Sequence, residues 1–235
     1  MVVKVFVLGR PGSGKTTAVR HIIKLAQNRG WFAIRIKDYD ILYGMFQADT
    51  EHKKFRPVAH GGFDVLDFSV LDTALEKLQK IVQDQERLSS AEDGFIIIEF
   101  ARNNYREALK HFSSDFLRDS FFFFVDADVE TCIQRIQTRI TSSTAEDNHY
   151  VSEHIIRNYY NKDNWKYMAN NLKRDYGIKK QRVRTFYNIG SLQEFIGDVD
   201  RFVDVMFCSK THIAVNRDFW RSLVEKIDHW GNVIL

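Results

Sequence analysis

A glycine-rich segment near the start of the chain has the residue types and the spacing to hold an anion. It matches the pattern G-x-x-x-x-G-K-[ST] at every fixed position. Its residues are Gly9, Arg10, Pro11, Gly12, Ser13, Gly14, Lys15 and Thr16. Glycines let successive backbone N–H groups turn onto phosphate oxygens, and the N-terminus of a following helix adds positive charge at the same point. We therefore expect these residues and Thr17 to bind the phosphates of a nucleotide, with Lys15 on the β- and γ-phosphates and the Thr16 hydroxyl on Mg²⁺.

The residues on either side of this segment fit that interpretation. Residues 2–8 read VVKVFVL, a short β-branched run typical of a buried strand. Residues 17–28 carry apolar side chains at helical spacing. The alternative is a glycine turn that arose by chance, and the order of strand, glycine loop and helix argues against it.

Further apolar runs and amphipathic patterns predict the fold class. Strands are predicted at residues 31–37, 94–100, 121–126 and 183–189. Helices are predicted at 41–48, 65–82, 105–116, 129–140, 151–173 and 192–207, and a mobile polar loop at 49–64. Buried strands that alternate with helices indicate an α/β fold with a five-stranded parallel sheet and helices on both faces. The carboxyl ends of the strands then share one edge, where ligands bind.

Three acidic residues at predicted strand ends are candidates for catalysis. Glu99 ends the third strand and is the candidate Mg²⁺ ligand, directly or through water, unless it is a surface carboxylate. Asp38 and Asp40 follow the second strand. Either could take the proton of an acceptor hydroxyl or anchor the substrate, and either could instead cap the next helix.

Four arginines are candidates for contacts to phosphate or substrate, because guanidinium groups suit phosphate oxygens. Arg135 and Arg139 lie four residues apart on one predicted helix, just before a polar segment at 141–149 that predicts a lid over the nucleotide. Arg102 follows Glu99 at the same sheet edge, and Arg56 lies in the polar loop; both are candidate substrate ligands. The alternative for each is a surface arginine that serves solubility.

The composition sets outer limits on function. The chain has 235 residues, 44% of them hydrophobic, and a net charge of +3. This charge suits an anionic ligand but is too small for a dedicated nucleic-acid binder, and no apolar run is long enough to span a membrane. The two cysteines, Cys132 and Cys208, indicate a reducing compartment and no disulfide framework. We therefore expect a cytoplasmic protein.

Taken together, these segments resemble the P-loop kinases, in particular the nucleoside and nucleotide kinase-like branch. GRPGSGKTT is similar to their phosphate loop, KDYDIL to the acidic turn of uridine and adenylylsulfate kinases, and IIEFAR to a strand end of deoxynucleoside kinases. CIQRIQTR resembles their lid helix, and FYNIGSLQEF the strand and turn that cradle adenine. The resemblance implies a kinase domain over residues 1–208 with a lid at about 135–150, Arg135 on the nucleotide, and Asn188 and Gly190 at the adenine.

These features favour an ATP- and Mg²⁺-dependent kinase that phosphorylates a nucleoside, a nucleotide or a similar small acceptor at a hydroxyl or phosphate. Two alternatives stay open: a P-loop ATPase or nucleotide-binding switch, and an effector kinase that acts on RNA or protein. Glu99 is followed by Phe100 and not by a second acid, which argues against hydrolysis as the purpose. A tail helix predicted within residues 209–235 either packs on the core or joins two copies of the chain.

Overall fold

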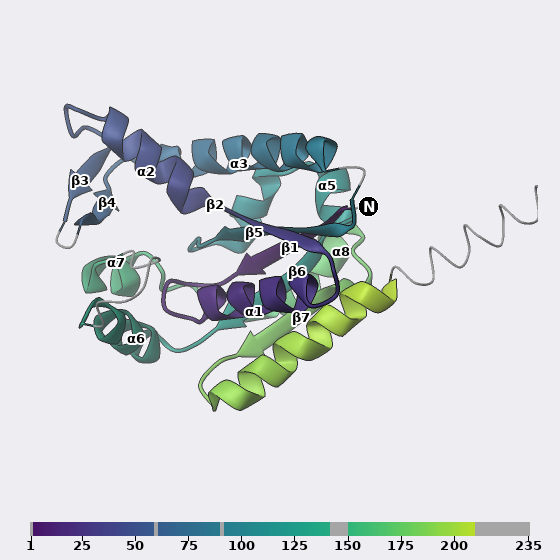
Figure 1. Ribbon diagram of the computed structural model, residues 1–235. Coiled ribbons are helices and arrows are strands. Elements are labelled where there is room, and N and C mark those ends of the chain that lie inside the picture. Colours follow the sequence, from purple (N-terminus) through teal and green to yellow (C-terminus); the bar gives the residue numbers. More distant parts are fainter. Residues whose placement is uncertain (1, 59–60, 90–91, 142–149, 210–235) are drawn as a thin grey trace, which may run out of the picture.

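The chain folds around a parallel sheet whose five strands run in the order β2-β5-β1-β6-β7 (Figure 1). This computed structural model describes residues 2–58, 61–89, 92–141 and 150–209. The strands are β1 (Val2–Leu8), β2 (Phe32–Lys37), β5 (Gly94–Phe100), β6 (Phe121–Asp126) and β7 (Val183–Tyr187). The predicted α/β fold with a five-stranded parallel sheet is confirmed, and four of its strands end within one residue of the predicted bounds.

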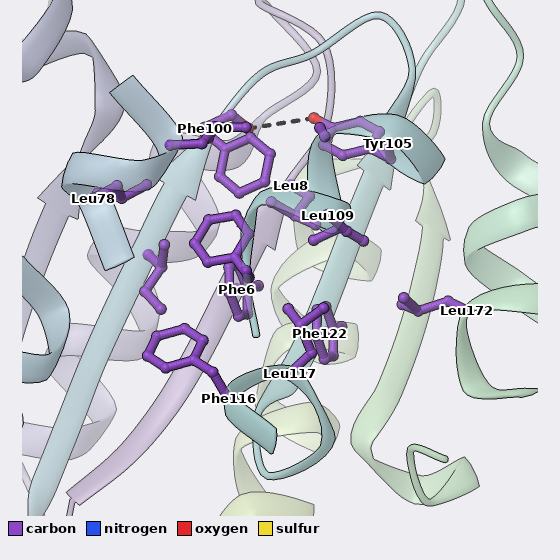
Figure 2. Close-up of a cluster of buried hydrophobic side chains, with 14 of the residues drawn as sticks. Phe6, Leu8, Leu78, Phe100, Tyr105, Leu109, Phe116, Leu117, Phe122 and Leu172 are labelled. Carbon is purple, nitrogen blue, oxygen red and sulfur yellow. Dashed lines mark hydrogen bonds between the residues drawn. The ribbon is translucent and has the colours of Figure 1, made fainter. Parts of the chain in front are cut away.

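Two hydrophobic cores lie on opposite faces of this sheet, because the side chains of a strand alternate between its faces. On one face, Phe6 stacks on Phe122 with a ring separation of 4.9 Å, beneath α3 (Ser69–Leu88) (Figure 2). On the other face, Val5 and Val7 pack with α1 (Lys15–Gln27) and with the helix over residues 192–209. The sheet is therefore covered by helices on both faces, as predicted (Figure 1).

Shorter helices connect the strands at both edges of the sheet (Figure 1). They are α2 (Asp38–Ala48), α4 (Tyr105–Ala108), α5 (Ser114–Arg118), α6 (Val129–Thr141), α7 (Glu153–Asn158) and α8 (Leu172–Tyr176). Among the described residues, no helix combines the length and the apolar character needed to cross a membrane.

The predicted loop at 49–64 contains a small hairpin instead. Strands β3 (Phe55–Pro57) and β4 (Phe63–Val65) pair antiparallel, and the ring of the fully buried Phe55 packs edge-on against Phe63 at 5.3 Å. This hairpin takes up Val65, so α3 begins at Ser69 and not at residue 65 as predicted.

Three other predicted bounds were wrong. Helix α2 starts at Asp38, directly after β2, whereas the predicted start was residue 41. The predicted helix at 105–116 is broken into α4, a 3₁₀ turn and α5. The helix predicted at 151–173 is broken as well: α7 ends at Asn158, and a second helical segment with a π-helical turn at Tyr167–Asn171 covers residues 165–176. Asn164 explains the second break, since its side chain accepts from the Tyr105 N–H and donates to the Asn103 carbonyl. The lid segment at 142–149 and the predicted tail helix lie outside the described residues.

Candidate active site

A cavity of about 420 Å³ lies at the carboxyl edge of the sheet. Lys15 and its neighbours in the glycine-rich segment, which we call the phosphate loop, line one part of it. Asp38 and Glu99 line it from the ends of β2 and β5, and aromatic side chains such as Phe63 and Tyr159 close the rest. Residues that are far apart in the sequence thus share one space, as the parallel sheet predicts.

The phosphate loop is held in shape by two side chains from other elements. The Gly9 N–H donates to the Tyr105 hydroxyl at 2.7 Å, and Asn188 donates from Nδ2 to the Ser13 carbonyl at 2.8 Å. Gly14 has a φ of +113°, and a Cβ at this position would lie only 2.5 Å from the Asn188 Nδ2 atom. The Ser13 hydroxyl is buried and has no hydrogen-bond partner among the described residues. The loop is therefore a preformed cradle of glycine-rich backbone at the start of α1, which suits a phosphate.

Lys15 is the cation beneath this cradle. Its Nζ donates to the Arg10 carbonyl at 3.1 Å. Burial lowers the pKa of its ammonium group, while the carboxylates of Glu99 and Asp38 act in the opposite direction. A desolvated ammonium group gains more from a phosphate than an exposed one does, so the burial of Lys15 suits its predicted contact with the phosphates.

Thr16 and Glu99, the two predicted Mg²⁺ ligands, lie on either side of Arg35. The Arg35 Nη2 atom is 2.7 Å from Glu99 Oε2 and 3.3 Å from Thr16 Oγ1. Hydroxyl and carboxylate oxygens are the ligands that Mg²⁺ prefers, so this donor set fits the ion. Within the described ranges, no group of three or more His, Cys, Asp or Glu side chains is placed to hold a metal. A metal here would share its coordination with oxygens of the nucleotide.

Asp38 and Asp40 occupy different environments although both lie in the first turn of α2. Asp38 is buried, lines the cavity and forms an ion pair with Arg102 from the end of β5. Burial raises the pKa of the Asp38 carboxyl, and Arg102 acts in the opposite direction. The Asp40 side chain is 62% exposed, pairs with Lys37 Nζ at 3.3 Å and does not line the cavity. The structure thus brings Asp38 to the site and leaves Asp40 outside it.

A sequence profile of the family described as "AAA domain" matches residues 5–157, more than half of the chain. The chain belongs to this AAA-domain family. The match runs from β1 through the phosphate loop to α7, so it covers most of the elements that line the cavity.

Solved structures show which fold this AAA-domain chain has. APS kinase CysC of Mycobacterium tuberculosis, in complex with AMPPNP and APS, is similar with a TM-score of 0.51 and 15% identity, over 87% of this chain and 96% of that one. A gluconokinase from Sinorhizobium meliloti 1021 is similar with a TM-score of 0.45 and 14% identity, over 93% and 97% of the two chains. The likeness to the APS kinase, at a TM-score above 0.5, shows that this chain has the fold of a P-loop kinase, as the resemblance implied.

One curated relative shares only a short segment with the AAA-domain chain. It is the ABC multidrug transporter I of Aspergillus fumigatus, which is 52% identical over 52 residues, or 22% of this chain. The AAA-domain chain spans 3% of the length of that protein.

The predicted lid helix α6 brings both of its arginines to the cavity of the AAA-domain chain. Arg135 donates from Nη1 to the Ser13 carbonyl at 3.4 Å, and Arg139 lines the same cavity. Thr17 and Arg102 line it as well. These side chains share the cavity with the phosphate loop and the acidic residues, and their contact with a ligand stays a prediction.

Besides Gly9, Ser13, Asp40 and Asn188, three more predicted contacts are not among the residues that line the cavity. Arg10 pairs through Nε with Asp126 at 3.0 Å, and Arg56 pairs with Asp64 on the β3–β4 hairpin at 2.9 Å. Gly190 lies next to Glu194 at the start of the last described helix. A role for these three in ligand contact stays a prediction.

Sequence reasoning predicted no role for Arg35 or for the hairpin residues Phe63 and Asp64. Arg35 could have been recognised in the sequence as a candidate site residue, because it is a charged residue inside the apolar run WFAIRIK. Phe63 and Asp64 both line the cavity, but no sequence pattern indicated this, since they lie in a polar segment without periodicity.

Proposed function

We propose that this protein is a kinase that transfers the γ-phosphoryl group of ATP to a small molecule bound in the same cavity. The extent of the cavity is the observation that most supports this proposal. It extends from Lys15 and Thr16, where the phosphates are expected, to the Asp38 carboxylate and on to aromatic side chains. Hydrolysis needs space for a water molecule, whereas phosphoryl transfer needs space for a second substrate beside the terminal phosphate. The APS kinase with the same fold was solved with both an ATP analogue and a second small molecule, which fits this interpretation.

The phosphate loop would hold the donor. Its backbone N–H groups and Lys15 bind the β- and γ-phosphates, while Tyr105 and Asn188 keep the loop in shape. Mg²⁺, when bound by Thr16 and Glu99, would neutralise charge on the phosphate oxygens. The arginines of α6 stabilise the charge on the migrating group.

Asp38 would activate the acceptor. Its carboxylate takes the proton of the acceptor hydroxyl while the hydroxyl oxygen bonds to the γ-phosphorus. The bond from the γ-phosphorus to the oxygen that bridges to the β-phosphate breaks, and ADP leaves with that electron pair. Burial raises the pKa of Asp38, which makes it a stronger base, and the ion pair with Arg102 orients the carboxylate.

One assay tests this proposal against the alternatives. The full chain is incubated with γ-labelled ATP and Mg²⁺, with and without panels of nucleosides, nucleotides and small alcohols. We expect label on one class of acceptor and little phosphate release without it. Equal phosphate release with and without acceptors would support an ATPase or switch instead. Label on added RNA or protein would support an effector kinase.

A further inference from the structure

We infer that the acceptor is an uncharged molecule that carries a flat aromatic ring, and not a phosphorylated or carboxylated one. This inference rests on the proposed function, because it describes the second substrate of the same cavity. It narrows the range of candidate acceptors, since nucleosides remain among them and nucleotides are excluded.

Aromatic side chains form much of the cavity wall away from the phosphate loop. They are Tyr39, Phe63, Phe68, Tyr150, Tyr159 and Tyr160. They come from three separate parts of the chain: α2, the β3–β4 hairpin with its exit, and the segment around α7. Tyr39 stacks on Phe63 at 5.4 Å, and Phe68 stacks on Tyr159 at 4.9 Å with the ring planes 16° apart. Walls of this kind gain most from contact with another flat ring.

The charged side chains in this part of the cavity are paired with one another. Asp38 pairs with Arg102, and Asp64 pairs with Arg56 at 2.9 Å. Lys37, which directly precedes Asp38 and also lines the cavity, pairs with Asp40 at 3.3 Å. The remaining cations that line the cavity belong to α1, β2 and α6. An anionic group on the acceptor would need a cation of its own here, because an unpaired buried charge is costly. The pairing therefore favours an uncharged acceptor.

Arg102 fixes the position of Asp38 in this part of the cavity. Its Nη1 donates to Asp38 and to the Ala101 carbonyl, and its Nη2 donates to the Leu71 carbonyl at 2.7 Å. The side chain is only 5% exposed, so its charge is committed to these partners. Uncharged aromatic alcohols, of which nucleosides are one example, meet both requirements: a flat ring for the wall and no charge of their own.

Calorimetry on the full chain tests this with matched probes. The donor site is first saturated with Mg–ADP, so that the probes report on the rest of the cavity. The probes are ribose, the four ribonucleosides and their 5′-monophosphates, which differ by a ring or by a phosphate. We expect at least one nucleoside to bind roughly tenfold or more tightly than ribose and than its own monophosphate. A monophosphate that binds more tightly than its nucleoside, ribose that binds as well as the nucleosides, or no binding by any nucleoside would overturn the inference.

Two variants connect that binding to the aromatic wall. Phe68 is 47% exposed, so Phe68→Ala removes a cavity ring at little cost to folding. It should weaken nucleoside binding roughly tenfold and leave Mg–ADP binding unchanged. Leu88→Ala is the matched control, because Leu88 is 79% exposed at the end of α3 and does not line the cavity. Equal effects of the two changes on nucleoside binding would overturn the inference.

Phosphoryl transfer to the same probes is measured separately. A nucleoside that binds as described but receives no phosphate leaves this inference standing and removes the proposed function. Transfer to a monophosphate or to ribose leaves the proposed function standing and removes this inference.

Discussion

Arg35 and Glu99 form an ion pair at 2.7 Å between the neighbouring strands β2 and β5, inside the candidate active site. The same guanidinium lies 3.3 Å from the Thr16 hydroxyl, the group that the phosphate-loop motif assigns to Mg²⁺. The guanidinium is therefore a cation between two oxygen groups that a metal ion would use. Without nucleotide, we expect Arg35 and a divalent metal to compete for this position.

We predict that Arg35→Met strengthens the binding of a divalent metal to the nucleotide-free protein. Methionine keeps much of the length of arginine without its charge, so Glu99 and Thr16 become available to the ion. The affinity for Mn²⁺, measured by electron paramagnetic resonance, should rise roughly tenfold or more. Arg29→Met is the control, because Arg29 pairs with Asp204 on the surface. Equal Mn²⁺ affinity of the wild type and Arg35→Met would show that Arg35 does not compete with the ion.

We predict that Asn188→Ala weakens the phosphate loop. Asn188 is buried and donates to the Ser13 carbonyl at 2.8 Å, so its loss leaves that carbonyl without this donor and opens space beside Gly14. The free energy of unfolding should fall by about 1–3 kcal/mol, and the Kd for nucleotide should rise. Urea unfolding and calorimetry measure the two effects. Asn158→Ala, an exposed change at the end of α7, should leave both unchanged.

We predict that Asp38→Asn lowers kcat roughly 10²- to 10⁴-fold while nucleotide affinity stays near that of the wild type. An amide keeps the size of the carboxylate and can still accept a hydrogen bond from Arg102, but it cannot take a proton from the acceptor. Asp40→Asn changes an exposed residue two positions further along α2 and should have little effect on kcat. A larger loss in Asp40→Asn than in Asp38→Asn would assign the base to Asp40.

The contrast between these two aspartates marks a limit of the sequence. The phosphate loop could be predicted to the residue, because its motif, the strand before it and the helix after it are all local. The convergence of Glu99 and Arg102, at the end of β5, with the phosphate loop, at the end of β1, could be predicted too, because parallel strands end at one edge. From the sequence alone, Asp38 and Asp40 are equally good candidates for the catalytic base, since both follow β2. Only the start of α2 at Asp38 and its packing against β5 bury the first and expose the second.

The acceptor part of the cavity could not be predicted for a related reason. Phe63 lies in a polar segment, and its contact with Tyr39 depends on a hairpin of two three-residue strands. Strands this short leave almost no periodic signal. Arg35 was detectable as a charge within a strand, but its position beside Thr16 depends on how β2, β5 and α1 meet.

We predict that Lys15→Ala lowers kcat roughly 10²-fold or more, because Lys15 would stabilise charge on the transferred phosphoryl group. Stability should respond differently. Burial lowers the pKa of Lys15, which means that burying its charge opposes folding, so the melting temperature should not fall with the loss of activity. Lys24→Ala, an exposed change on the same helix, is the control for both measurements. Near-normal turnover in Lys15→Ala would argue against the kinase function.

Cys132 is a buried residue on α6. Its backbone packs so closely on the phosphate loop that a Cβ added to Gly12 would collide with it. Burial raises the pKa of this thiol to about 11, from an ordinary value of 9.0. Since only the thiolate reacts, labelling of Cys132 at pH 8 should be roughly 10²-fold slower than that of an ordinary thiol.

Two single-cysteine variants test this prediction. Cys208→Ser leaves only Cys132, and Cys132→Ser leaves only the exposed Cys208. Burial disfavours the thiolate, so the labelling rate of Cys132 should keep rising with pH up to about 11. Poor access alone would lower the rate at every pH but would let it level off near pH 9, as for an ordinary thiol. The pH at which the rate levels off therefore separates a shifted pKa from simple steric protection, and a plateau near pH 9 would contradict the shift.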